Sequence, residues 1–154
     1  MNTDLLVDRV RAAVATVDDP EYPGISIVDL GLLESLDTTH DGHVAVGLIP
    51  TFSGCPALSM IADDVRRVVD AVDGVEGVDV RWLGAPVWGV DRVTETARAT
   101  MAREFTVAVR IGRGPVACPR CGSPTHEQSM FGPSRCRAVH PCPACAEVVE
   151  VMRA

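Results

Sequence analysis

Several residue types and motifs are scarce or absent in this chain of 154 residues, and each absence narrows what the protein can be. Aromatic residues make up only 4% of the sequence, so the core must be aliphatic and rich in Val and Ala. No apolar run approaches the ~20 residues of a membrane-spanning helix. The chain has no Glu-x-x-His pair of the kind that di-iron carboxylate sites use, and no glycine-rich dinucleotide fingerprint. We therefore expect no membrane insertion, no di-iron catalysis and no flavin or NAD binding.

Lysine is missing altogether, so all 14 basic residues are arginines, set against 21 acidic residues for a net charge of −7. Residues 1–104 carry 8 Arg and 18 acidic residues (net −10), whereas residues 105–154 carry 6 Arg and 3 acidic residues (net +3). A strongly acidic body repels phosphates, which argues against nucleic-acid binding. The acidic N-terminus lacks the apolar core of a secretion signal, so we expect a cytoplasmic protein.

The first two thirds of the chain carry clear periodicity. Apolar residues three or four positions apart predict helices, and alternating apolar residues predict strands. Thr3, Pro56 and Asp91 are suited to helix starts, and His40-Asp41-Gly42 is suited to a hairpin turn. The pattern predicts an α+β fold of order α-β-β-α-β-α, with elements at about 3–17, 32–38, 43–51, 56–73, 78–83 and 91–104.

The last third of the chain has a different composition. Six of the eleven prolines and five of the six cysteines lie between residues 115 and 145. A segment this short cannot build a sufficient apolar core and needs a metal or another cross-link to fold. We therefore predict a domain over 1–104, a linker over 105–116 and a small module over 117–154.

Four of these cysteines have the spacing of a metal site. Cys118 and Cys121 form one Cys-x2-Cys pair, Cys142 and Cys145 form another, and 20 residues separate the pairs. In the cytosol thiols stay reduced, so clustered cysteines bind metal more often than they form disulfides. Two such pairs complete a tetrahedral four-sulfur site, which suits structural Zn²⁺ in a zinc ribbon. Both pairs also resemble rubredoxin knuckles, so a single Fe is the alternative.

One further cysteine and two histidines belong to the same region. Cys136 is expected to be a small buried thiol beneath the ribbon, and the alternative is an additional ligand or a reactive thiol near the metal. His126 and His140 are expected at the surface or behind the metal ligands, and the alternative is that either one replaces a cysteine in the ligand set.

Cys55 stands apart from the others, between the second predicted strand and the helix that follows it. A thiol at a helix N-terminus experiences the positive end of the helix dipole, which favours the thiolate that binds metals or attacks electrophiles. Thr51 and Ser53 offer hydroxyl groups nearby. The alternative is a small structural residue tucked under the sheet.

Three segments carry a family resemblance: Asp19-Pro20-Glu21, the run 25–32, and Thr51-Phe52-Ser53-Gly54-Cys55-Pro56. Over about residues 3–104 the chain resembles the iron–sulfur assembly domain of bacterial SufT and its eukaryotic relatives. The resemblance implies an α+β domain in which a Cys before a Pro handles Fe or an Fe–S cluster. The matching positions here are Cys55, Thr51 and Asp29.

The second part of the chain narrows the resemblance. An assembly-type domain joined to a four-cysteine zinc ribbon resembles the PaaD (PaaJ) subunits of phenylacetyl-CoA epoxidase. The segments that match are the Pro-x-Trp run within 85–91, the knuckle at 118–123 and the segment 129–132. The likeness therefore spans nearly the whole chain.

This resemblance implies an accessory subunit, not itself catalytic, of a multicomponent monooxygenase in phenylacetate catabolism. Its partners would be the oxygenase and the Fe–S flavin reductase components, to one of which it would deliver Fe or an Fe–S cluster. Cys55 would hold this cargo transiently, and Thr51 and Asp29 would shape the pocket. The ribbon would hold zinc and dock the client protein.

Two other functions stay open at this level. A thiol or electron carrier would use Fe in the ribbon, or Cys55 together with Cys136. A nucleic-acid-binding ribbon would use the module's arginines, namely Arg120, Arg135, Arg137 and Arg153.

Overall fold

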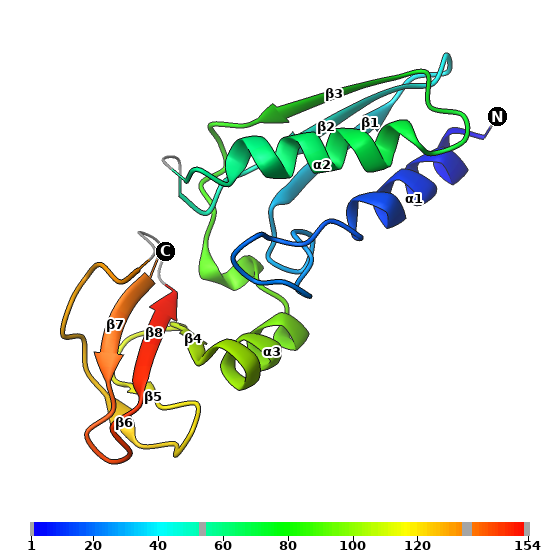
Figure 1. Ribbon diagram of the computed structural model, residues 1–154. Helices are drawn as coiled ribbons and strands as arrows, with labels where there is room; N and C mark the ends of the chain where they lie inside the picture. The colour runs from blue at the N-terminus through cyan, green and yellow to red at the C-terminus, as the bar shows by residue number, and fades with distance from the viewer. Residues whose placement is uncertain (1, 53–54, 134–136, 153–154) are drawn as a thin grey trace. The chain divides into compact units, whose positions relative to one another are not determined.

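The computed structural model describes residues 2–52, 55–133 and 137–152 (Figure 1). The chain forms two compact units, Met1–Trp88 and Gly89–Ala154, which we call the N-terminal unit and the ribbon unit. Within the described residues, no helix combines the length and the apolar character that crossing a bilayer requires.

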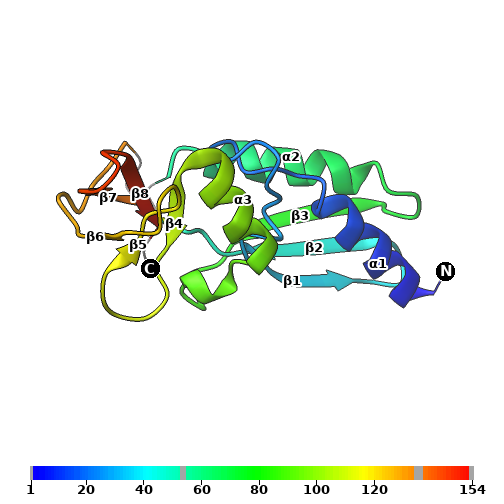
Figure 2. The same cartoon turned by 90° about the horizontal axis from the view of Figure 1, so that it is seen from below.

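The N-terminal unit is a three-stranded sheet with two helices on one face (Figures 1 and 2). Its elements are α1 (Thr3–Val14), β1 (Leu33–Thr38), β2 (His43–Leu48), α2 (Leu58–Asp70) and β3 (Gly77–Trp82). The strand order is β1-β2-β3, with β1 antiparallel and β3 parallel to β2. The predicted order of elements and the predicted hairpin are confirmed. The parallel pairing follows from the helical crossover between β2 and β3.

One face of the central strand carries the core of this unit. Val44, Val46 and Leu48 are buried at alternating positions of β2, whereas His43 and Ala45 are exposed. The helices bury residues at helical spacing, namely Leu6, Val10, Val14, Ile61, Val65 and Val69. Removing these aliphatic side chains from water is what holds both helices against the sheet.

The helix starts differ from those expected. Asn2 caps α1 in place of Thr3, because its side chain accepts a hydrogen bond from the Asp4 N–H at 3.1 Å. α2 begins at Leu58 rather than at Pro56, and its N-cap residue Ala57 makes no side-chain capping bond. The difference matters for Cys55, which therefore lies in the loop before the helix.

The ribbon unit contains one α-helix and two small sheets. Its elements are η1 (Val90–Arg92), α3 (Glu95–Phe105), β4 (Val107–Val109), β5 (Val116–Ala117), β6 (Pro124–Thr125), β7 (Arg137–Pro141) and β8 (Val148–Met152). One sheet has the order β4-β8-β7 and the other pairs β5 with β6. Thr94, rather than Asp91, caps α3 by accepting from the Ala97 N–H at 3.2 Å.

The segment expected to be a linker is partly structured. Within 105–116, β4 pairs in parallel with β8, and its Val107 is fully buried. The compact units divide after Trp88, so α3 belongs with the ribbon, whereas the sequence placed this helix in the first domain. The physical reason is that α3 runs directly into β4 and packs against it.

Candidate metal centre and cysteine loop

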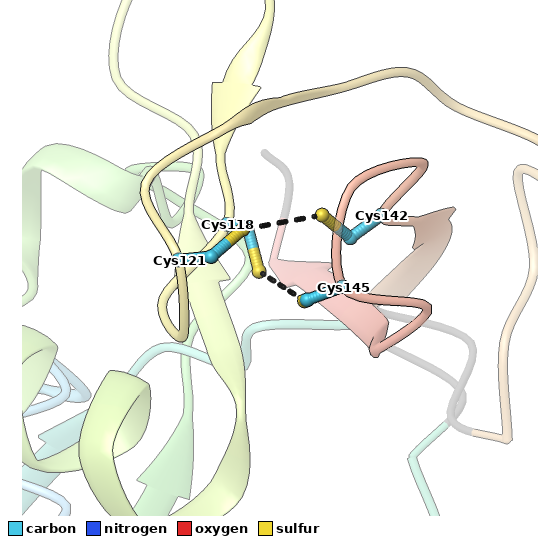
Figure 3. Close-up of side chains that lie close together, drawn as sticks. All are labelled: Cys118, Cys121, Cys142 and Cys145. Carbon is cyan, nitrogen blue, oxygen red and sulfur yellow. Dashed lines mark hydrogen bonds between the residues drawn. The ribbon is translucent and has the colours of Figure 1, made fainter.

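The four cysteines predicted as metal ligands come together in the ribbon unit. Cys118 and Cys121 lie in the turn between β5 and β6, and Cys142 and Cys145 lie in the turn between β7 and β8. Figure 3 shows the four side chains pointing toward one another from these two turns. All four sulfur atoms lie within 4.8 Å of one another. The Cys118–Cys145 pair of Sγ atoms is 3.7 Å apart and the Cys121–Cys142 pair is 3.5 Å apart.

These distances fit a single tetrahedral ion. Four sulfurs at the Zn–S distance of ~2.3 Å are ~3.8 Å apart in a regular tetrahedron, close to the two shortest separations here. The set contains only thiols, which suits Zn²⁺ or a single Fe. With four protein ligands such a site is closed, so a bound ion would act as a structural cross-link.

Backbone hydrogen bonds shape both turns in the same way. The Gly122 N–H donates to the Cys118 carbonyl at 2.8 Å, and the Ala146 N–H donates to the Cys142 carbonyl at 3.0 Å. Both residues adopt the left-handed conformation, with φ of 77° at Gly122 and 63° at Ala146. Each turn thus folds back on itself so that both of its sulfurs reach one point.

The pKa values of two thiols in this cluster are shifted in opposite directions. Hydrogen bonds from the side chain and the backbone of Ser123 to the Cys121 sulfur lower the pKa of Cys121 to about 6. At Cys145 the backbone N–H of Glu147 lowers the pKa, but partial desolvation and the neighbouring thiols outweigh it and raise the pKa to about 12. A raised pKa is what neighbouring thiols produce where they share a site, and a divalent ion bound there would favour the thiolate form of Cys145.

The histidines of the module are not among the clustered ligands of the described residues. His140 is fully buried, and its Nδ1 lies 3.2 Å from Thr125 Oγ1. Because the Thr125 hydroxyl donates to the Val116 carbonyl at 2.7 Å, it accepts a hydrogen bond from His140. Burial, together with the Arg110 charge, lowers the pKa of His140. The histidine thus ties β7 to the β5–β6 pair behind the cysteines. Cys136 lies outside the described residues.

Cys55 lies in the loop that joins β2 to α2. Its side chain is partly buried, its N–H donates to the Phe52 carbonyl at 3.2 Å, and its carbonyl accepts from the Leu58 N–H at 3.3 Å. The thiol therefore precedes α2 by one tight turn instead of occupying the first helical turn. Ser53, expected nearby, lies outside the described residues.

The other two residues predicted beside Cys55 lie at the same end of the sheet. The start of β1 pairs with the end of β2, and the Ile49 N–H donates to the Leu32 carbonyl at 2.8 Å. Asp29 lies in the segment before β1, and Thr51 follows β2; both are partly buried. Topology thus places Asp29, Thr51 and Cys55 on neighbouring loops.

Trp88 anchors the segment that contains Asp29, a role that the sequence did not predict. Its indole Nε1 donates to the Leu30 carbonyl at 2.8 Å, and its side chain is buried. The segment after β3 thereby holds the segment that contains Asp29. A Trp after a predicted strand was a signal that its side chain would be buried. The sequence could not show which group it bonds, because Leu30 is 58 residues away.

Comparison with known proteins agrees with this two-part structure. Residues 7–81 match the family model described as an iron–sulfur cluster assembly protein, and residues 103–153 match the PaaD zinc β-ribbon domain. A relative from Escherichia coli is 32% identical over 92% of this chain and 88% of its own length. The chain belongs to the PaaD family. The name of this relative provisionally assigns it to a 1,2-phenylacetyl-CoA epoxidase, as one of the subunits of that enzyme.

Two further comparisons concern the assembly part of this PaaD-family chain. A protein of Porphyromonas gingivalis named as an Fe–S protein maturation auxiliary factor is 42% identical over 63% of this chain and 93% of its own length. The crystal structure of a domain of unknown function from Bacillus anthracis has a TM-score of 0.63 and 26% identity, covering 68% of this chain and 98% of that one. Cys55, Thr51 and Asp29 fall within the assembly match, and the four clustered cysteines fall within the PaaD ribbon match.

Proposed function

We propose that this chain is an accessory subunit of a phenylacetyl-CoA epoxidase system that delivers Fe or an Fe–S cluster to the reductase or oxygenase component. It does not carry the oxygenation chemistry. The observation that supports this most is the union, in one chain, of an iron–sulfur assembly domain with a PaaD-type ribbon, shared with the Escherichia coli relative over most of both lengths.

The single thiol of the N-terminal unit supports a transient carrier. Cys55 is the only cysteine in residues 1–88. Stable Fe–S clusters are held by several protein ligands, commonly four cysteines. One thiolate from this unit leaves the other iron positions open to the cysteines of a client. Transfer would then be ligand exchange, in which the bond from Cys55 sulfur to iron breaks as a client thiolate bonds the same iron, with no change of oxidation state.

The surroundings of Cys55 suit a cargo that must enter and leave. The thiol is partly buried in a loop, and Ala57 leaves the first N–H groups of α2 without a side-chain cap. The Leu58 N–H donates to the Cys55 carbonyl, but N–H groups at a helix N-terminus in general stabilise negative charge, such as that of a thiolate or a cluster sulfide. Thr51 and Asp29 would contribute a hydroxyl and a carboxylate at the rim.

The ribbon would serve as the docking part. Residues 89–154 carry 9 Arg and 6 acidic residues (net +3), whereas residues 1–88 carry 5 Arg and 15 acidic residues (net −10). A cross-linked ribbon with four thiolate ligands has no open position for chemistry, so its contribution is a rigid surface. Its opposite charge lets it approach an acidic client that the N-terminal unit would repel.

The test is Cys55→Ser in a strain that produces the oxygenase and reductase components together with this chain. We expect the variant to keep its fold and one zinc per chain, while the client components contain less iron and sulfide and the oxygenase activity falls at least tenfold. Ser59→Ala, an exposed substitution on α2, is the matched control and should leave every readout unchanged.

Two outcomes would overturn the proposal. Full client iron content with Cys55→Ser would remove the carrier role of this thiol. Iron without sulfide and without zinc in the purified wild-type chain would favour a rubredoxin-like electron carrier, because the same four thiolates can hold one Fe.

A further inference from the structure

Arg120 lies between the two cysteines of the first metal turn, yet its guanidinium contacts α3 and the second turn. Nη1 donates to the Arg103 carbonyl at 3.1 Å, and Nη2 donates to Thr106 Oγ1 at 2.7 Å. Nε lies 3.9 Å from the carboxylate of Glu147, which follows the second pair of cysteines. One side chain therefore joins both metal turns to the end of α3.

The end of α3 requires such a partner. The last carbonyls of a helix have no intrahelical N–H, and Arg103 supplies one of them in a helix that ends at Phe105. A cation at this position also complements the negative end of the helix dipole. Arg120 thus acts as a C-terminal cap that comes from another part of the unit.

Thr106 adds a second reason. It adopts the left-handed conformation with φ of 53°, which is strained for a β-branched residue. Its N–H donates to the Met101 carbonyl, and its carbonyl accepts from the Glu150 N–H at 3.2 Å. The bond from Arg120 to its hydroxyl is a third restraint on the residue that turns the chain from α3 into β4.

The backbone of Arg120 is in turn fixed by the cysteine turn. Its N–H donates to Cys118 Sγ at 3.4 Å, and the Gly122 N–H closes the turn on the Cys118 carbonyl at 2.8 Å. The first of these contacts involves one of the four clustered sulfurs, so it depends on where that sulfur is held. A metal on the four cysteines would therefore fix where the guanidinium lies.

We propose that Arg120 is a positioning residue that makes the order of the last turn of α3 and of β4 depend on the metal occupancy of the four-cysteine centre. Both elements belong to the ribbon unit. Metal loading thereby determines whether the junction between α3 and β4 is rigid. The inference rests on the metal centre and is independent of the cargo assigned to Cys55.

Hydrogen exchange of the full-length, zinc-loaded chain tests this directly. In Arg120→Met we expect amide exchange across 103–109 to be faster than in the wild type by about tenfold. Zinc content should stay at one per chain, and the β7–β8 amides should remain protected. Arg120→Lys, which keeps the charge but loses the planar fork, should fall between the two. Arg113→Met, an exposed arginine of the same unit, should match the wild type.

Chelation supplies the second arm of the experiment. Removing zinc from the wild type should accelerate amide exchange across 103–109. In Arg120→Met, where exchange in this segment is already fast, removing zinc should accelerate it little further. Unchanged exchange across 103–109 in zinc-loaded Arg120→Met would overturn the proposal. Loss of zinc from Arg120→Met would also overturn the proposal. Arg120 would then be needed to bind the metal, whereas the proposal has its position depend on the bound metal.

Discussion

At the scale of single residues, the two metal turns differ at one equivalent position. The fourth residue after the first cysteine of each pair is Gly122 in one turn and Ala146 in the other, and both have positive φ. Glycine adopts this conformation freely, whereas alanine pays about 1 kcal/mol because of its Cβ. The second turn therefore stores strain that the first does not, and a metal on the four cysteines would help to hold it in place.

Exchanging these two residue types should move stability in opposite directions. We expect Ala146→Gly to raise the free energy of unfolding of the zinc-loaded ribbon by about 0.5–1 kcal/mol, and Gly122→Ala to lower it by about 1 kcal/mol. A Cβ at Gly122 would meet no atom within 4 Å, so its cost is one of backbone conformation and not of packing. Denaturant titration measures both, and a neutral Gly122→Ala would show that the turn relaxes.

At the scale of elements, periodicity predicted where helices and strands occur, while hydrogen bonds decided at which residue each helix begins. Asn2 and Thr94 cap their helices because their side chains reach an N–H two or three residues ahead. Thr3 and Asp91 have equally suitable side chains but lie in different backbone positions. The start of α2 at Leu58 has the same kind of cause, because Pro56 and Ala57 fall in the turn closed by the Cys55 carbonyl.

The segment that contains Leu30 and Asp29 depends on the indole of Trp88 in the same way. Trp88→Phe removes the donor to the buried Leu30 carbonyl and should lower the free energy of unfolding by about 2 kcal/mol. Trp82→Phe is the matched control: its Nε1 is buried but has no hydrogen-bond partner among the described residues. We expect a smaller loss there, set by packing alone. Thermal unfolding of both variants checks this, and equal losses would contradict it.

At the scale of the whole molecule, the two units differ in what holds them together. The N-terminal unit has an aliphatic core shared by a sheet and two helices. The ribbon unit also buries apolar side chains of α3, β4 and β8, such as Met101, Val107 and Met152. The cluster behind its cysteine turns consists of Cys118, Cys142, Val149 and Val151, so two of its four members are candidate metal ligands. A cluster of this size supplies little stability without a cross-link.

Metal removal should therefore act on one unit. A ligand that binds only the folded state stabilises it by about 4 kcal/mol at 1,000 times its Kd. We expect a chelator to lower the unfolding temperature of the ribbon strongly and to leave that of the N-terminal unit within about 2 °C. Calorimetry with and without chelator measures the unfolding temperatures of the two units. Proteolysis within 89–154 under the same conditions shows which transition belongs to the ribbon. A single transition unaffected by the chelator would contradict it.

Local patterns in the sequence determined the α+β class, the order of the elements, the hairpin and the four cysteines of the metal centre. Each of these depends on spacing within a short segment, because a helix or strand repeats its burial every few residues and a Cys-x2-Cys pair forms one turn. The positions of Cys55, Thr51 and Asp29 came from a family resemblance, and their role stays a prediction.

Tertiary structure alone decided the pairings between distant segments. These are the parallel pairing of β4 with β8, the bond from Trp88 to Leu30 and the bond from Arg120 to Thr106. The first of them makes β4, and with it α3, part of the ribbon unit. The physical reason is that periodicity records only that a residue will be buried or bonded. Which distant group meets it depends on how whole elements pack, and no short stretch of sequence contains that information.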